Sequence, residues 1–423
     1  MPNEMSSSPR AVPDAPIAPA VAPVTQGAIR QSRPAAGPRR LRRILSLDDF
    51  EIAAKRHLPR PIFGFVAGAS ETNASRRDNR EAFQEYGFVP RGLVDTSKRS
   101  QAAELFGRRY AAPFGIAPMG IAAIAAYRAD LVLARAAARV NIPFVLSGSS
   151  LIKLEDVIRE NPDSWFQAYL PGEDSRILAL LDRVETAGFK TLVVTIDVPV
   201  SANRENNVRN GFTTPLKPSL RLAWDGLIRP RWLVDTWFRT FVRHGMPYFE
   251  NSYATRGAPI LSRDVARDLG MRDHLSWRHL DLIRRRWRGR LALKGVMSKE
   301  DARIARDSGV DGVLVSNHGG RQLDGTVSPL RVLPEIAALA SPMTVMYDSG
   351  VRRGADVLKA LALGAKFVFV GRPFLFAASI AGEAGAEHVA GILSQEINRN
   401  MALLGITGLD QMKKELLMEI RRG

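Results

Sequence analysis

The chain has 423 residues and a formal net charge of +17, because lysine and arginine outnumber aspartate and glutamate. It has no cysteine, so disulfide bridges and thiolate metal sites are excluded. Six scattered histidines do not suggest a metal cluster, and no uninterrupted apolar run reaches the roughly 20 residues that a membrane-spanning helix needs. Any membrane contact is therefore expected to be peripheral, and the lack of cysteine leaves the compartment undecided.

The first 43 residues are rich in proline, alanine, serine and arginine and hold almost no large apolar side chains. Such a segment cannot bury enough surface to offset the entropy of ordering, so residues 1–43 are predicted to be a disordered tail. Pro13, Pro16, Pro19 and Pro23 interrupt the one stretch that could supply the apolar core of a secretory signal.

Residues 44–423 are predicted to form one folded domain, since insertions often enlarge a single domain to this size. Its first helix should begin near Leu47. Ser46 is a suitable N-cap for that helix, and Asp48 and Asp49 place negative charge in its first turn.

From Pro113 onward, short apolar runs alternate with amphipathic helical patterns, which predicts an α/β fold of the (β/α)8, or TIM barrel, type. The eight predicted strands are Phe114–Ala117, Phe144–Ser147, Trp165–Tyr169, Leu192–Asp197, Leu291–Lys294, Gly312–Ser316, Thr344–Asp348 and Phe367–Gly371. The clearest predicted helices are Asp130–Val140, Asp174–Ala187, Lys299–Asp307 and Ala355–Leu363.

A long insertion, residues 211–290 including a following helix, separates the fourth and fifth predicted strands. It holds 16 lysine and arginine residues against seven acidic ones, and five of the six tryptophans of the chain. Basic residues mixed with tryptophan are typical of a segment that contacts an anionic membrane surface. Nucleic acid is the weaker alternative because no nucleic-acid motif is present, and a solvated loop that packs its tryptophans on the barrel is equally compatible.

Polar or glycine residues stand at the carboxyl ends of six predicted strands, which is the rim where barrel enzymes assemble their active sites. The sequence therefore predicts one site built from many strands. These residues are Gln167 and Tyr169, Thr195 and Asp197, Lys294, His318 and Arg321, Asp348, and Gly371 with Arg372.

The most informative stretch, Ser316–Gly325, sets an imidazole and a guanidinium three residues apart just after an apolar strand. His318 is the candidate base because imidazole titrates near neutral pH, and Asp197 would orient it as a hydrogen-bonded carboxylate. Arg321 suits an anionic substrate because a guanidinium can hold a carboxylate through two parallel hydrogen bonds.

This stretch, with Thr195–Pro199 and Asp348–Gly354, resembles the FMN-dependent α-hydroxy acid oxidoreductases, the family of glycolate oxidase, lactate and mandelate dehydrogenases and flavocytochrome b2. Similar pieces recur in order from about Leu58 to Arg372. The resemblance implies an FMN-binding barrel that oxidises an L-2-hydroxy acid to the 2-oxo acid.

It also implies roles for individual residues. His318, Asp197 and Tyr169 would be catalytic, with Tyr169 hydrogen-bonded to the substrate oxygen at the reacting carbon, and Arg321 and Arg204 would hold the substrate carboxylate. The residues expected to bind FMN are Pro118, Met119, Gly120, Ser147, Gln167, Thr195, Lys294, Ser316, Asp348, Gly350, Arg352, Gly371 and Arg372. No metal site is expected.

The sequence departs from the family pattern at Phe65, where relatives usually carry a tyrosine that helps bind the substrate carboxylate. Loss of one hydrogen bond to a charged group costs about 1.5–3 kcal/mol, so weaker carboxylate binding or a different substrate is expected. Ser149 stands where some relatives carry a bulky aromatic residue, which indicates room for a larger substrate side chain.

Several alternatives stay open at this level. The electron acceptor is expected to be a quinone, a cytochrome or O2, and with O2 the enzyme would be an oxidase. A substrate other than a hydroxy acid, such as an amine or alcohol on a modified peptide, and a non-enzymatic basic surface-binding protein are the rival functions. The resemblance implies a homotetramer, and the expected location is the cytoplasm, with peripheral contact to the inner face of the membrane and no nucleic-acid partner.

Overall fold

The computed structural model describes residues 38–213, 216–262 and 272–420. Contacts divide the chain into residues 1–36 and 37–423, so the first unit, and with it most of the predicted tail, lies outside the described residues. The predicted tail, residues 1–43, extends too far along the chain, because residues 38–43 are part of the folded unit. Arg39–Leu41 forms a 3-10 turn (η1) and Leu41 is only 4% exposed, because its side chain packs into the core of the folded unit.

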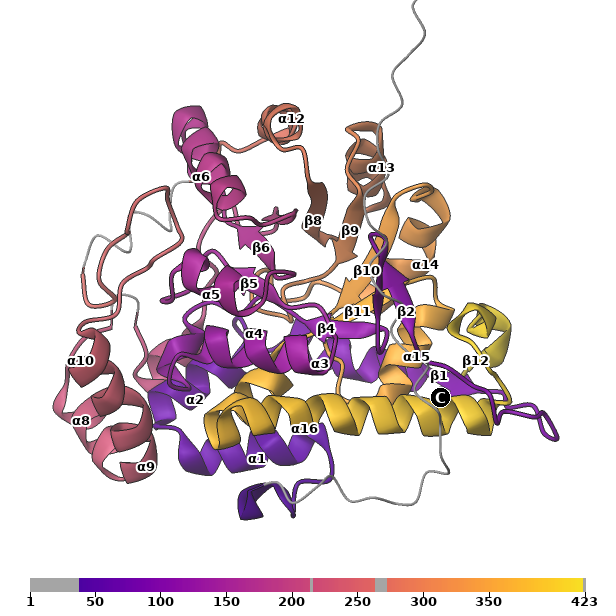
Figure 1. The fold of residues 1–423 in the computed structure, drawn as a ribbon, viewed down its shortest axis with the longest axis horizontal. Coiled ribbons are helices and arrows are strands. Elements are labelled where there is room, and N and C mark those ends of the chain that lie inside the picture. The colour runs from indigo at the N-terminus through magenta and orange to yellow at the C-terminus, as the bar shows by residue number, and fades with distance from the viewer. Residues whose placement is uncertain (1–37, 214–215, 263–271, 421–423) are drawn as a thin grey trace, which may run out of the picture. The chain divides into compact units, whose positions relative to one another are not determined.

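The folded unit is built around eight parallel strands that form a barrel, as predicted (Figure 1). Hydrogen bonds connect them in the order β4-β11-β10-β9-β8-β7-β6-β5, and a parallel bridge between Ile116 and Phe144 joins the two ends. Each strand lies within a predicted apolar run or overlaps it closely. The strands are β4 (Phe114–Ile116), β5 (Val145–Ser147), β6 (Trp165–Ala168), β7 (Thr191–Thr195), β8 (Arg290–Val296), β9 (Gly312–Val315), β10 (Thr344–Asp348) and β11 (Phe367–Val370).

Helices surround the strands and bury one apolar face each. In α6, for example, Ile177, Leu180, Leu181 and Val184 recur at helical spacing and are all buried. The four clearest predicted helices are confirmed to within one residue at each end. The surrounding helices are α4 (Ala129–Arg139), α5 (Leu154–Glu160), α6 (Asp174–Thr186), α12 (Trp277–Arg286), α13 (Lys299–Asp307), α14 (Pro329–Leu339), α15 (Gly354–Ala362) and α16 (Arg372–Leu404), which bends at Ala381 and Gly382.

The segment before the barrel packs against its side, and α1 lies alongside α16 (Figure 1). The predicted N-cap of α1 is confirmed, because the Ser46 hydroxyl accepts a hydrogen bond from the Asp49 amide and the Asp49 carboxylate accepts one from the Ser46 amide. The elements of this segment are α1 (Leu47–His57), α2 (Arg60–Ala67), α3 (Ala74–Glu81) and η2 (Ala82–Glu85).

Two small antiparallel sheets complete the fold. The hairpin of β2 (Ala103–Leu105) and β3 (Arg108–Tyr110) covers the amino ends of the barrel strands, where Leu105 and Tyr110 are buried beside Trp165 and Phe367. The other sheet pairs β1 (Tyr86–Phe88) with β12 (Leu417–Glu419), which follows the short turns η5 (Leu409–Gln411) and η6 (Lys414–Leu416).

The first half of the insertion after β7 is mostly helical. It starts beyond α7 (Glu205–Asn210) and contains α8 (Leu220–Leu227), α9 (Pro230–Trp232), the π-helical η4 (Leu233–Phe238) and α10 (Arg239–His244). Its tryptophans occupy both buried and exposed positions, since Trp232 is 5% exposed and donates to the Ile124 carbonyl, whereas Trp224 is 63% exposed. In the part of the chain that the structure describes, no helix is both long and apolar enough to cross a bilayer.

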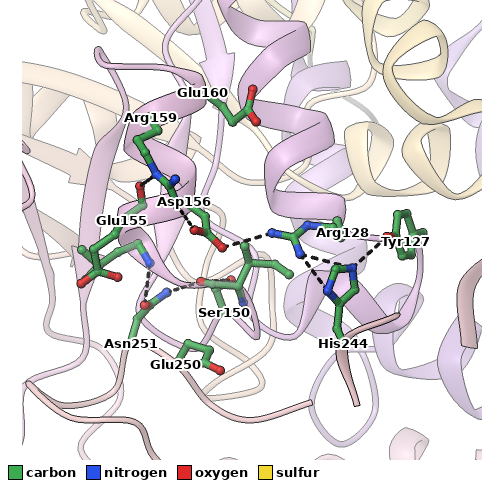
Figure 2. A network of polar contacts seen from close by, with 12 residues as sticks. Tyr127, Arg128, Ser150, Glu155, Asp156, Arg159, Glu160, His244, Glu250 and Asn251 are labelled. Carbon is green, nitrogen blue, oxygen red and sulfur yellow. Dashed lines mark hydrogen bonds and ion pairs between the residues drawn. The ribbon is translucent and has the colours of Figure 1, made fainter. Parts of the chain in front are cut away.

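Polar contacts connect the middle of the insertion to the barrel (Figure 2). His244 at the end of α10 lies 2.8 Å from the Tyr127 hydroxyl and 3.3 Å from the Arg128 guanidinium, and Arg128 also contacts Asp156 of α5 at 3.1 Å. Farther along, Asn251 accepts from the Leu154 amide at 3.0 Å. These contacts hold the insertion against the loop between β4 and α4 and the loop that leads into α5.

Candidate active site

A cavity of about 550 Å³ opens at the carboxyl ends of the barrel strands. The predicted site residues that line it are Pro118, Met119, Gly120, Tyr169, Arg204, Lys294, His318, Arg321, Asp348, Gly350, Arg352, Gly371 and Arg372. The other predicted residues sit directly behind them. Ser147 ends β5 beside Gln167, Thr195 ends β7 beside Lys294, Ser316 follows β9, and Asp197 contacts His318.

His318 lies between a carboxylate and a phenol. Its Nδ1 is 3.0 Å and 3.2 Å from the two carboxylate oxygens of Asp197, and its Nε2 is 3.3 Å from the Tyr169 hydroxyl. When Nδ1 donates to Asp197, the lone pair of Nε2 faces the cavity. The arrangement can therefore accept a proton at Nε2 while the carboxylate fixes the ring.

The charge states follow from burial and from the neighbouring groups. Burial lowers the pKa of His318, and the positive charge of Lys294 acts in the same direction against the opposing effect of Asp197. Burial by itself would raise the pKa of Asp197, but the charge and hydrogen bond of His318 and the charge of Lys294 hold that pKa below its ordinary value. At neutral pH the site thus combines a neutral imidazole with an ionised carboxylate.

The backbone around His318 is left-handed over three successive residues, with φ of +57° at His318, +66° at Gly319 and +75° at Gly320. A side chain at Gly320 would meet the backbone nitrogen of Arg76 at 2.6 Å, so glycine is required there. The Ser316 hydroxyl accepts from the His318 amide at 3.0 Å and stabilises the unusual turn. Such strain in a non-glycine residue is typical of a functional site.

Gly295 is a site residue that the sequence reasoning missed. Its φ is +101°, and a Cβ there would come within 2.6 Å of the Cβ and Cγ atoms of Asp197. Glycine at this position lets the carboxylate approach His318 from the end of the neighbouring strand. The glycine directly after Lys294 was visible in the sequence, but its purpose depends on the pairing of β7 with β8.

Arg321 and Arg204 are partly buried cations without an acidic partner among the described residues. Nη1 of Arg321 donates to the carbonyls of Phe65 and Gly68 at 2.8 Å and 2.9 Å, and Arg204 donates to the Arg321 carbonyl and to Gln322. Across the described residues, no carboxylate lies within ion-pair distance of either guanidinium. Burial, together with the charges of Arg204 and Arg372, lowers the pKa of Arg321 strongly. An anion bound here would relieve that repulsion.

A second cationic area lies at the loops after β10 and β11. Arg372 donates to the carbonyls of Val66, Gly68 and Gly319, and burial with the charges of Arg76 and Arg352 lowers its pKa to about 9. The amino ends of α15 and α16 begin at these same loops. Backbone N–H groups at helix starts and guanidinium groups are the donors that bind phosphate, so this end of the cavity suits a phosphate group.

The floor of the cavity suits the polar edge of a flavin. Lys294 is 4% exposed, donates to the Ser316 hydroxyl at 3.0 Å and lies 3.5 Å from Asp348. Burial opposes its charge, but Asp348 and Asp197 outweigh burial and raise its pKa. Nε2 of Gln167 and Oγ1 of Thr195 are buried without a hydrogen-bond partner. Each such group costs about 1–3 kcal/mol unless a ligand satisfies it, so the donor set fits FMN.

The outer wall of the cavity is apolar and partly comes from the insertion. Phe65 stacks on Phe212 with ring centroids 4.4 Å apart, and the Arg321 guanidinium lies 5.0 Å from the Phe65 ring. Phe249 and Ser149 also line the cavity. Phe212 and Phe249 were not predicted as site residues. No local pattern around them indicates that the chain returns to the strand ends.

Known proteins resemble this chain over most of its length. The family model described as FMN-dependent dehydrogenase matches residues 54–419. The (S)-mandelate dehydrogenase of Pseudomonas putida is 36% identical over 376 residues, which cover 88% of this chain and 94% of that protein. An L-lactate dehydrogenase of Caulobacter sp. (strain K31) is 36% identical over 388 residues, or 90% of this chain and 100% of the relative.

Solved structures give a matching result. A crystal structure of the monotopic membrane protein (S)-mandelate dehydrogenase has a TM-score of 0.83 at 36% identity and covers 89% of this chain and 100% of its own. A crystal structure of mandelate oxidase with benzoyl-formic acid has a TM-score of 0.72 at 33% identity, with 88% of this chain and 98% of that chain covered.

Proposed function

This chain belongs to the FMN-dependent dehydrogenase family, and from that membership we propose that it oxidises an L-2-hydroxy acid with a bulky, mandelate-like side chain to the 2-oxo acid. The observation that carries the proposal is one cavity lined by a neutral imidazole and by two partly buried arginines without acidic partners. The imidazole can accept a proton, and the positive charges of the arginines favour binding of a carboxylate.

Arg321 and Arg204 hold the substrate carboxylate. Only Nη1 of Arg321 donates within the described protein, so the remaining guanidinium nitrogens can donate to a ligand. Arg204 is kept in place by the Arg321 carbonyl and the Gln322 side chain. Two fixed cations orient the α-carbon of the substrate, which is a large part of what an enzyme contributes to such a reaction.

His318 takes a proton from the substrate at Nε2 as the α-carbon is oxidised. Asp197 stabilises the imidazolium that results, and Tyr169 donates a hydrogen bond to the substrate oxygen on the reacting carbon. The chemistry that bound FMN supplies is acceptance of the two electrons that leave this carbon. Lys294 stabilises negative charge at the polar edge of the cofactor, where Gln167 and Thr195 are available as further hydrogen-bond partners.

The preference for a bulky side chain follows from the walls of the cavity. Ser149 and Gly120 add little side-chain bulk to the wall, and Phe65, Phe212 and Phe249 provide flat apolar surface for an aryl group. A lactate methyl group would leave most of this surface without a contact partner.

An anaerobic titration of the purified yellow protein tests this function. The flavin absorbance should bleach on addition of L-mandelate and, more slowly, of L-lactate. If no 2-hydroxy acid bleaches the flavin, the hydroxy-acid proposal fails and an amine or alcohol substrate on a modified peptide takes its place. Restoration of the colour by air at the turnover rate would identify an oxidase rather than a dehydrogenase that uses a quinone or cytochrome.

A peripheral membrane contact is the second part of the proposal. The insertion helices α8 to α10 expose apolar residues next to arginines, and a related (S)-mandelate dehydrogenase is described as a monotopic membrane protein. The exposed apolar residues are Leu220, Trp224, Leu227, Ile228, Val234, Phe238, Phe241 and Val242. We propose that this surface, called the insertion face below, binds the anionic inner face of the cell membrane, where a quinone acceptor is within reach.

A further inference from the structure

A second cavity, of about 620 Å³, lies at the opposite end of the barrel, below the amino ends of β6 to β9. We call it the lower cavity. The β2–β3 hairpin forms one wall, and the loops that lead into the four strands form the others. It is lined by Leu105, Phe106, Arg108, Tyr110, Pro162, Asp163, Ser164, Trp165, Lys190, Thr191, Arg284, Arg288, Gly289, Arg290 and Asp311.

The lining of the lower cavity has an excess of positive charge, with five cations against two carboxylates. Arg108 pairs with Asp163, and Arg284 and Arg290 share Asp311 at 3.1 Å and 2.8 Å. Lys190 and Arg288 have no acidic partner within the described ranges. Two cations therefore remain available for an anion that enters the cavity.

The inner wall of the lower cavity is aromatic. The rings of Phe106 and Trp165 lie with centroids 5.3 Å apart, and Trp165 is 4% exposed. The Arg290 guanidinium lies 5.9 Å from the Phe106 ring, which adds a cation beside the same flat surface. An inorganic anion would satisfy the charges but make no contact with the partly exposed ring of Phe106.

Ser164 provides an independent indication of a ligand. Its side chain is 1% exposed and lines the lower cavity, yet its hydroxyl has no hydrogen-bond partner in the structure. A buried hydroxyl without a partner is costly, and a polar atom of a bound molecule would satisfy it. The cavity thus offers a flat apolar wall, a free donor and two free cations to one occupant.

We propose that the lower cavity binds an aromatic carboxylate, with its ring against Phe106 and Trp165 and its carboxylate near Lys190 and Arg288. This site is separate from the catalytic cavity and does not depend on the proposed reaction. It is nevertheless connected to it through side-chain packing, since Trp165 lies 5.4 Å from Phe369, which lines the catalytic cavity. An occupant of the lower cavity is therefore separated from the cofactor cavity by two layers of aromatic rings.

The test uses the full chain loaded with FMN and 4-bromobenzoate as the probe. In crystals soaked with this compound, anomalous scattering should place bromine in the lower cavity. Isothermal titration calorimetry should count one site fewer per chain in Lys190→Ala/Arg288→Ala than in the unaltered protein. The matched control is Arg91→Ala/Lys98→Ala, which removes one exposed arginine and one exposed lysine elsewhere and should keep every site.

Three results would overturn the proposal. The first is bromine density confined to the catalytic cavity, and the second is a lower site that Lys190→Ala/Arg288→Ala leaves unchanged. The third is inorganic phosphate displacing the probe at equal concentration, because the aromatic wall would then contribute nothing. Flavin absorbance controls for misfolding of the double variant. Loss of a site supports the proposal when this absorbance equals that of the unaltered protein.

Discussion

The carboxyl rim of the barrel and the insertion face use the same residue types under opposite conditions. At the rim, Arg204, Arg321 and Lys294 line one cavity, where burial and neighbouring charges shift their pKa values. On the insertion face the arginines and aromatic side chains are largely exposed to solvent. A partly buried charge interacts strongly with a few neighbouring groups, so a change at one of them has a large effect. An exposed charge is screened by water and salt, so its effect is small and adds to that of many others.

The largest effect is expected at the rim from His318→Gln. Removing the proposed base should lower kcat by about 10²–10⁴-fold, because general-base catalysis contributes that much in typical enzymes. Stopped-flow reduction of the flavin by L-mandelate measures it. His388→Gln, in α16 with its ring nitrogen 2.9 Å from the Ile44 carbonyl, is the control and should retain activity. Equal rates for both variants would remove His318 from the proposed mechanism.

Gly295→Ala should lower kcat roughly 10²-fold, although it changes none of the groups proposed to react. The added methyl group would overlap Asp197 and move the carboxylate away from His318, and displacements of about 1 Å can cost that much. Gly391→Ala is the matched control, because a methyl group there meets open space. The flavin absorbance separates this effect from loss of cofactor, and an unchanged kcat would show that the contact between Gly295 and Asp197 has no catalytic consequence.

The pH dependence of kcat/KM tests the pairing of His318 with Asp197. Because burial lowers the pKa of His318, the neutral base should persist below the ordinary value of about 6.5. Activity should then stay level at neutral pH and fall about tenfold per pH unit only as the pH drops through the lowered pKa. In Asp197→Asn, which removes the carboxylate that favours imidazolium, the midpoint should move to still lower pH. A midpoint above 6.5 in the unaltered enzyme would contradict the assigned charge states.

The smallest effect is expected on the insertion face. Trp224→Ser/Phe238→Ser should weaken binding to vesicles of phosphatidylglycerol roughly tenfold or more, since each large apolar side chain contributes about 1.5–3 kcal/mol when fully buried. The rate of flavin reduction should be unaffected. Leu403→Ser/Met418→Ser, which alters exposed apolar residues outside the insertion, is the control for co-sedimentation. Binding that is equally strong to neutral phosphatidylcholine vesicles would argue against the role of the arginines.

Much of the rim could be predicted because the signals are local. Apolar runs of four to six residues predict the barrel strands, and residues at or just after the end of each run emerge at one rim. His318, Lys294 and Asp348 could therefore be assigned to one site from the sequence. The insertion was harder to interpret. Its composition indicated both a membrane surface and a packed loop, and only the structure separates buried Trp232 from exposed Trp224.

The sequence by itself determined the barrel, its strand positions, the family and the set of polar residues at the carboxyl rim, because strand and helix periodicity and short motifs depend on neighbours along the chain. Only the tertiary structure decided that Gly295 makes room for Asp197, that Phe212 and Phe249 return from the insertion to line the cavity, and that Leu41 belongs to the core. These features depend on contacts between residues far apart in sequence, and such contacts leave no local pattern.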